Sequence, residues 1–123
     1  MALEVWESDF SGLLREAARG LASLVVQDEL PSGQEGNWLS LTVEGRDQED
    51  ILVSWLNEII FIMDTEGTLP HDARILESAQ GRVAGEILGV HLPFELKVKA
   101  ATYHGVKISR TPQGIAATIV FDV

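Results

Sequence analysis

The chain contains no cysteine, few basic residues and no long hydrophobic run, and each absence excludes a class of protein. Without cysteine there is no disulfide, no thiolate metal site and no cysteine nucleophile. The longest uninterrupted apolar run covers residues 59–63, far short of the roughly 18 residues that a membrane-spanning helix needs. The N-terminus lacks the basic and apolar regions of a secretory signal, so we expect a cytoplasmic protein with no membrane partner.

The shortage of basic residues is pronounced: nine lysines and arginines stand against nineteen aspartates and glutamates, a net charge of −10. Proteins that bind RNA or DNA on their own present a basic patch, because neutralising phosphates supplies much of the affinity. We therefore expect no strong independent nucleic-acid binding. An acidic surface suits a basic protein partner or a divalent cation. A length of 123 residues with 46% hydrophobic content indicates one globular domain, residues 1–123.

Two segments show apolar residues at helical spacing. The first covers residues 10–25, and Ser8 or Asp9 is its expected N-cap. The second covers about residues 48–64, follows the N-cap candidate Asp47, and is apolar nearly all round. A helix of that composition is expected to be buried between layers, with sheet on more than one side.

Most of the remaining chain has the patterns of β-strands. Seven strands are expected, at LEVWE, WLSLTVEG, ARILESA, GRVAGEILGV, FELKVKAATY, VKISR and IAATIVFDV. The stretch TPQG is a hairpin turn between the last two, and PSGQEGN is a turn after the first helix. The order β-α-β-α followed by five strands indicates an α+β domain, with two helices packed on mostly antiparallel β-sheet.

Lysine, tyrosine and histidine side chains interrupt the stretch KVKAATYHGVKI, which otherwise has the pattern of a buried strand. Alternation over residues 94–103 places Lys99 and Tyr103 on the outward face, where lysines commonly guard a solvated strand. His104 falls on the inward face unless Gly105 marks a bulge, and there we expect it to serve the stability of the fold.

Carboxylates and amides supply the other candidate residues. Glu58 and Asn57 lie on the single polar stripe of the second helix, where a buried polar group needs a partner in a neighbouring layer. Asp64, near the C-terminus of that helix, faces an unfavourable dipole and is either a turn-forming residue or part of a binding site. Asp122 stands beside the carboxylate of Val123, and two such groups make a weak ligand set for Ca²⁺ or Mg²⁺.

Three segments together resemble the archease family: WLNEIIFIMDTEG, KAATYHGVKI and IVFDV, in the family's order and spacing over nearly the whole chain. The resemblance implies an accessory protein that activates a GTP-dependent RNA ligase in tRNA splicing and RNA repair. Archeases promote guanylylation of the ligase and its repeated turnover. The resemblance also implies a divalent cation held by Asp122, Val123 and an opening aspartate. The family's opening Asp-His-Thr-Ala-Asp stretch is missing from this chain, which begins MALEVWE.

The resemblance implies a functional role for Lys99, which matches the family's lysine, and implies no catalytic residue. Lys99, Tyr103, Glu58, Asp64 and His104 are the candidate partner-binding residues. Two alternatives remain open: a chaperone-like binding module without a dedicated partner, and a small hydrolase that uses Glu58, Asp64 and His104. The hydrolase is disfavoured because the sequence has no recognisable nucleophile motif, phosphate loop or complete metal set.

Overall fold

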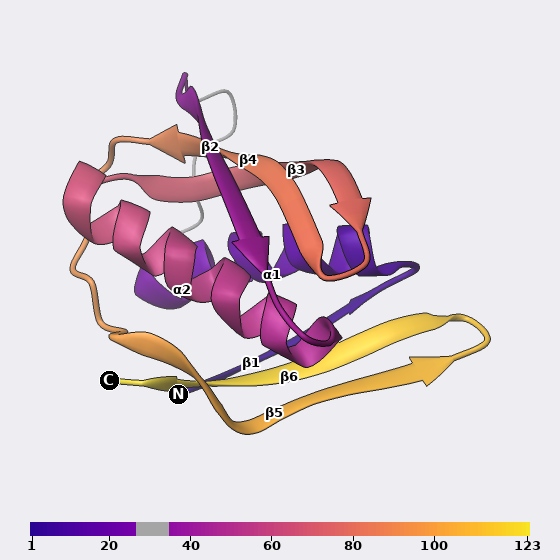
Figure 1. Cartoon of the computed structure of the whole chain (residues 1–123). Helices are drawn as coiled ribbons and strands as arrows, with labels where there is room; N and C mark the ends of the chain where they lie inside the picture. Colours follow the sequence, from indigo (N-terminus) through magenta and orange to yellow (C-terminus); the bar gives the residue numbers. More distant parts are fainter. Residues whose placement is uncertain (27–34) are drawn as a thin grey trace.

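The computed structural model describes residues 1–26 and 35–123, and in it two β-sheets enclose two helices (Figure 1). The elements in chain order are β1 (Ala2–Glu7), α1 (Phe10–Val25), β2 (Asn37–Glu44), α2 (Gln48–Glu66), β3 (Leu69–Ala79), β4 (Arg82–Val90), β5 (Ala100–Thr111) and β6 (Gly114–Asp122). The sheets have the strand orders β1-β6-β5 and β2-β4-β3, with every neighbouring pair antiparallel. The predicted α+β class is confirmed. Neither helix is long and apolar enough to cross a membrane within the described ranges.

Both helices begin at the residues that the sequence predicts. The carboxylate of Asp9 accepts a hydrogen bond from the Gly12 N–H at 2.7 Å, and the Asp47 carboxylate accepts one from Asp50 at 2.8 Å. Each bond satisfies a main-chain donor that has no partner inside its helix. Helix α2 ends at Gly67, whose positive φ of 62° is a conformation that glycine adopts at little cost. The turn expected at PSGQEGN lies partly outside the described residues.

The core is the space between the two sheets, and both helices fill it. Helix α1 contacts β1 and β3, while α2 contacts β5 and β2, so each helix packs against both sheets. Trp55 is fully buried, and its indole N–H donates to the main-chain carbonyl of Leu14 at 3.0 Å. The absence of a side chain at Gly85 admits this ring, since a Cβ there would lie 3.1 Å from it. The prediction that α2 is buried between layers is confirmed.

The prediction of five strands after α2 is wrong, because the described chain has four. Residues 94–99 are not a strand, and the expected strands FELKVKAATY and VKISR contribute to the single strand β5. The reason lies in the partner strand: Ala100 pairs with Asp122 at the end of β6, so the residues before Ala100 have no strand beside them. An alternating apolar–polar pattern does not form a strand by itself, because a strand's main-chain hydrogen bonds come from a neighbouring strand.

A bulge interrupts β5 at Gly105. Thr102 pairs with Val120 and Lys107 pairs with Thr118, so residues 103–106 lie opposite the single residue Ile119. Gly105 has a φ of 87°, in the left-handed region that favours glycine. The bulge turns His104 out to solvent. The inward placement of His104 is therefore wrong, and the bulge considered for Gly105 is what the structure contains.

Candidate functional site

A hollow of about 520 Å³ lies between the C-terminal half of α2 and the segment that leads into β5. We call it the α2 hollow. Phe61, on its α2 wall, is 60% exposed, although the other large apolar side chains of α2 are buried. The α2 residues of the hollow recur at helical spacing and therefore share one face. They are Asn57, Ile60, Phe61 and Asp64, and the facing residues are Leu96, Val98, Lys99 and Ala100.

Asn57 fixes the position of the facing segment. Its side-chain oxygen accepts a hydrogen bond from the Ala101 N–H at 2.7 Å, and its side-chain nitrogen donates to the Ala101 carbonyl at 3.1 Å. These two bonds satisfy both main-chain groups of Ala101, as a neighbouring strand would. The expectation that Asn57 pairs with groups of a neighbouring layer is confirmed.

Lys99 lies where the α2 hollow meets the end of β6. Its side chain is exposed, and its main-chain N–H donates to the carbonyl of Asp122 at 2.8 Å. The N–H of Phe121 donates to the Met1 carbonyl, also at 2.8 Å, so the two ends of the described chain lie side by side (Figure 1). Lys99 thus shares a hollow with Asp64 and adjoins Asp122, although these three residues are far apart in sequence.

Tyr103 belongs to a different part of the surface. Its hydroxyl donates to the Asp50 carboxylate at 2.5 Å, in the first turn of α2. That bond lowers the pKa of the Asp50 carboxyl and raises the pKa of the Tyr103 hydroxyl. Asp50 precedes Asp64 by 14 residues, roughly 21 Å along a helix. The predicted shared strand face does not form, because Lys99 precedes β5 and Tyr103 lies in its bulge. Both side chains meet α2, Lys99 along its C-terminal half and Tyr103 in its first turn.

The remaining candidates do not form a site together. Glu58 and His104 are exposed, and neither lines the α2 hollow or the neighbouring hollow that Asp64 forms with Met63, Gly67 and residues 92–96. The His104 carbonyl accepts a hydrogen bond from the Thr102 hydroxyl at 2.9 Å, which is a local contact of the bulge. The arrangement therefore gives no support to a hydrolase built on Glu58, Asp64 and His104.

Asp122 and Val123 are exposed at the end of β6. Within residues 1–26 and 35–123, no three histidine or acidic side chains converge in a way that could hold a metal ion. Ca²⁺ takes six to eight oxygen ligands, so water would have to supply most of them beside Asp122 and Val123. These residues fit a weakly held, largely hydrated cation only.

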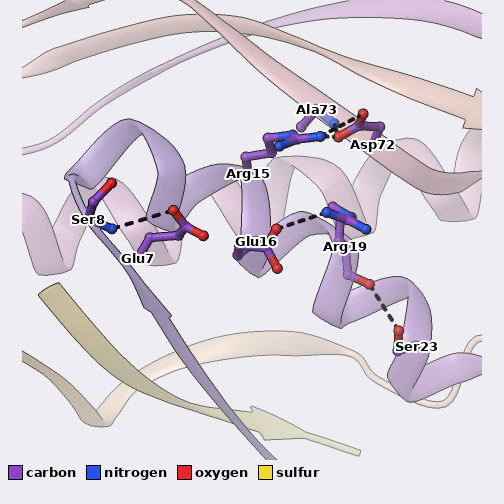
Figure 2. A network of polar contacts seen from close by, with 8 residues as sticks. All are labelled: Glu7, Ser8, Arg15, Glu16, Arg19, Ser23, Asp72 and Ala73. Carbon is purple, nitrogen blue, oxygen red and sulfur yellow. Dashed lines mark hydrogen bonds and ion pairs between the residues drawn. The ribbon is translucent and has the colours of Figure 1, made fainter. Parts of the chain in front are cut away.

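Sequence reasoning missed a polar network that joins α1 to β3 (Figure 2). The Arg15 guanidinium donates to both carboxylate oxygens of Asp72, at 2.8 and 3.1 Å. This bond lowers the pKa of Asp72 and raises that of Arg15. The arginine of β3, Arg74, lies 4.0 Å over the Trp38 ring and donates a hydrogen bond to Glu86. Only the polar position of Arg15 on α1 was visible in the sequence; its partner is 57 residues away.

The chain matches the Archease protein family (MTH1598/TM1083) over residues 1–123. It is 32% identical to the archease of Methanopyrus kandleri, over 99% of this chain and 91% of that protein. It is 30% identical to the archease of Archaeoglobus fulgidus, over 100% of this chain and 92% of that protein. The chain belongs to the archease family.

Two solved structures share the fold. The solution structure of Methanobacterium thermoautotrophicum protein 1598 matches with a TM-score of 0.72 and 24% identity, over 99% of this chain and 91% of that one. The crystal structure of a Thermotoga maritima archease, described as a possible chaperone, matches with a TM-score of 0.64 and 21% identity. That match covers 100% of this chain and 90% of the other. At these identities the likeness concerns the fold alone.

Proposed function

We propose that this protein activates a GTP-dependent RNA ligase of tRNA splicing and RNA repair. It acts by protein contact: it promotes guanylylation of the ligase and lets the ligase turn over repeatedly, while the ligase handles GTP and RNA. Membership of the archease family supports this assignment. The structural observation that carries it is the position of Lys99, exposed on the α2 hollow and tied through its main chain to Asp122.

The α2 hollow is suited to contact with a protein. Phe61 offers exposed apolar area, and Asp64 and Lys99 offer charges of opposite sign on the same hollow. Interfaces commonly combine an apolar anchor with charged groups that set orientation. Lys99 carries a flexible ammonium, which would donate to a carboxylate or a phosphate as a point charge and would not act as a base. The net charge of −10 suits a partner with basic surface.

A divalent cation, Ca²⁺ or Mg²⁺, forms part of this proposal. Asp122 and Val123 would hold it, and water would complete its shell. Because Lys99 donates its N–H to the Asp122 carbonyl, a cation there would lie beside the α2 hollow. The cation would supply positive charge at the contact with the ligase. The chain's own residues position the two elements that would meet the partner.

The test is GTP-dependent labelling of the cognate ligase in the presence of each variant. Lys99→Ala should reduce stimulation several-fold and leave the melting temperature nearly unchanged, because the side chain is exposed. Lys97→Ala is the matched control: it removes the same charge two residues away, from a residue that does not line the α2 hollow. Full stimulation by Lys99→Ala would contradict the assignment of that lysine.

A chaperone-like module is the second candidate, favoured by the exposure of Phe61. It predicts that the protein suppresses aggregation of unrelated clients and leaves ligase labelling unchanged. Activation of the ligase without protection of the clients would exclude it.

A further inference from the structure

The basic side chains of this acidic protein are not spread evenly over the described residues. Five arginines form ion pairs within the chain, at positions 15, 19, 46, 74 and 82. The other four basic residues form none in the described ranges, and all of them lie within residues 97–110: Lys97, Lys99, Lys107 and Arg110. No aspartate or glutamate occurs between Glu95 and Asp122. The chain therefore carries its unpaired positive charge along β5 and the segment leading into it.

Strand β5 is also an edge of its sheet. Its only strand partner in the described part of the chain is β6. At Ala101 the outer edge is occupied, because Asn57 bonds both the N–H and the carbonyl. Beyond the bulge at Gly105, no side chain or main-chain group outside the ladder bonds residues 106–110 within the described ranges. An edge of this kind presents unpaired donors and acceptors.

The register identifies which main-chain groups face outward. Thr111 and Gly114 close a hairpin around the two residues Pro112 and Gln113, so these two closing residues exchange hydrogen bonds. Pairs alternate between bonded and non-bonded along an antiparallel ladder. Arg110 is therefore in a non-bonded pair with Ile115, and its N–H and carbonyl point away from β6.

We propose that the outer edge of β5 over residues 106–111, the β5 edge, receives an extended acidic segment of a protein partner as an added strand. This rests on the proposed function in one respect: the partner is the RNA ligase. A strand offers alternating donors and acceptors to match those of the edge, whereas a phosphate chain offers acceptors only. Lys107 and Arg110 are exposed beside the edge and would attract carboxylates. An RNA strand would in addition meet the repulsion of a chain with a net charge of −10.

Three variants separate the main-chain and the charge contributions. Arg110→Ala removes the guanidinium and its apolar stem but keeps the main-chain N–H. Arg110→Pro removes the same charge and also the outward N–H, and it breaks no bond to β6, since proline is tolerated at such an edge position. Lys107→Glu combined with Arg110→Glu reverses the charge of the β5 edge. Binding to the cognate ligase is measured by calorimetry, with a thermal melt and sedimentation of each variant.

We expect Arg110→Ala to raise the Kd about 3-fold and the double reversal to raise it more than about 10-fold, an effect that shrinks in high salt. Arg110→Pro should raise the Kd about 3-fold beyond Arg110→Ala, because one main-chain hydrogen bond is lost. Equal affinities of Arg110→Pro and Arg110→Ala would overturn the added strand. So would self-association of the wild type that the double reversal abolishes, or binding of labelled RNA that it abolishes.

Binding and stimulation of the ligase, measured together, distinguish failure of the proposed function from failure of the β5 edge. If the wild type neither binds nor stimulates the ligase, the proposed function is wrong. If the wild type stimulates the ligase and all three variants bind as it does, only the β5 edge is wrong.

Discussion

The amide of Asn57 is the contact on which the geometry of the α2 hollow depends, so its removal should cost measurable stability. Asn57→Ala deletes two hydrogen bonds to Ala101, of 2.7 and 3.1 Å, in a partly buried position. Each bond contributes about 0.5–1.5 kcal/mol, and the loss is about 2 kcal/mol in total. With an unfolding entropy of about 2.1 cal/mol/K per residue, that loss lowers the melting temperature of a chain of this length by about 8 °C.

The assay is a thermal melt followed by circular dichroism, supported by urea unfolding. Glu58→Ala is the control, because Glu58 is the next residue on α2 and is exposed; its melting temperature should stay within about 2 °C of the wild type. Asn57→Asp keeps the acceptor for the Ala101 N–H but sets an oxygen against the Ala101 carbonyl, so it should also lose stability. A shift for Asn57→Ala no larger than that for Glu58→Ala would show that the two bonds to Ala101 do not stabilise the fold.

Three further predictions concern the core, the surface network and the cation. Trp55→Ala should cost about 3–5 kcal/mol of unfolding free energy, whereas Trp6→Ala, at a residue that is 57% exposed, should cost less than about 1 kcal/mol; equal losses in urea unfolding would contradict the layered core. The hydrogen bond from Arg15 lowers the pKa of the Asp72 carboxyl in the folded protein. The stability that the ion pair adds is therefore present above the pKa that this carboxyl has in the unfolded chain, and it is lost as the pH falls through the lower pKa of the folded protein. Asp72→Asn should therefore cost less than about 1 kcal/mol at pH 7, since the pair is partly exposed, and the gap to the wild type should close below about pH 4; a gap that persists in acid melts would speak against this linkage. Calorimetric titration with Ca²⁺ and Mg²⁺ should show weak binding to the wild type and none to Asp122→Asn. Equal affinity of the wild type and Asp122→Asn for either cation would contradict a cation site at Asp122.

The sequence predicted what depends on local chemistry. Asp9 and Asp47 cap their helices because a capping carboxylate bonds an N–H three residues along the same chain, which a sequence pattern can show. The strand predicted at WLSLTVEG is β2, and its alternate residues Leu41 and Val43 are buried. The buried position of α2 follows from a composition that leaves only a thin polar stripe.

What the sequence could not predict depends on partners far along the chain. Residues 94–99 alternate like a strand, but β6 ends before it can pair with them. The outward turn of His104 depends on the register at Gly105, which only the pairing with β6 defines. The contact of Tyr103 with α2 depends on the Asp50 carboxylate, 53 residues before Tyr103. Each of these errors concerns a contact between elements that local periodicity does not encode.

The proposed activation of an RNA ligase is tested by measuring guanylylation and sealing in the same reaction. The cognate ligase is incubated with radiolabelled GTP and a broken RNA, with the wild-type protein at a substoichiometric ratio or absent. We expect faster formation of the ligase–guanylate adduct, and several rounds of sealing per ligase molecule, only when the protein is present. An unchanged adduct rate and a single round of sealing, even at a stoichiometric excess of the protein, would contradict it.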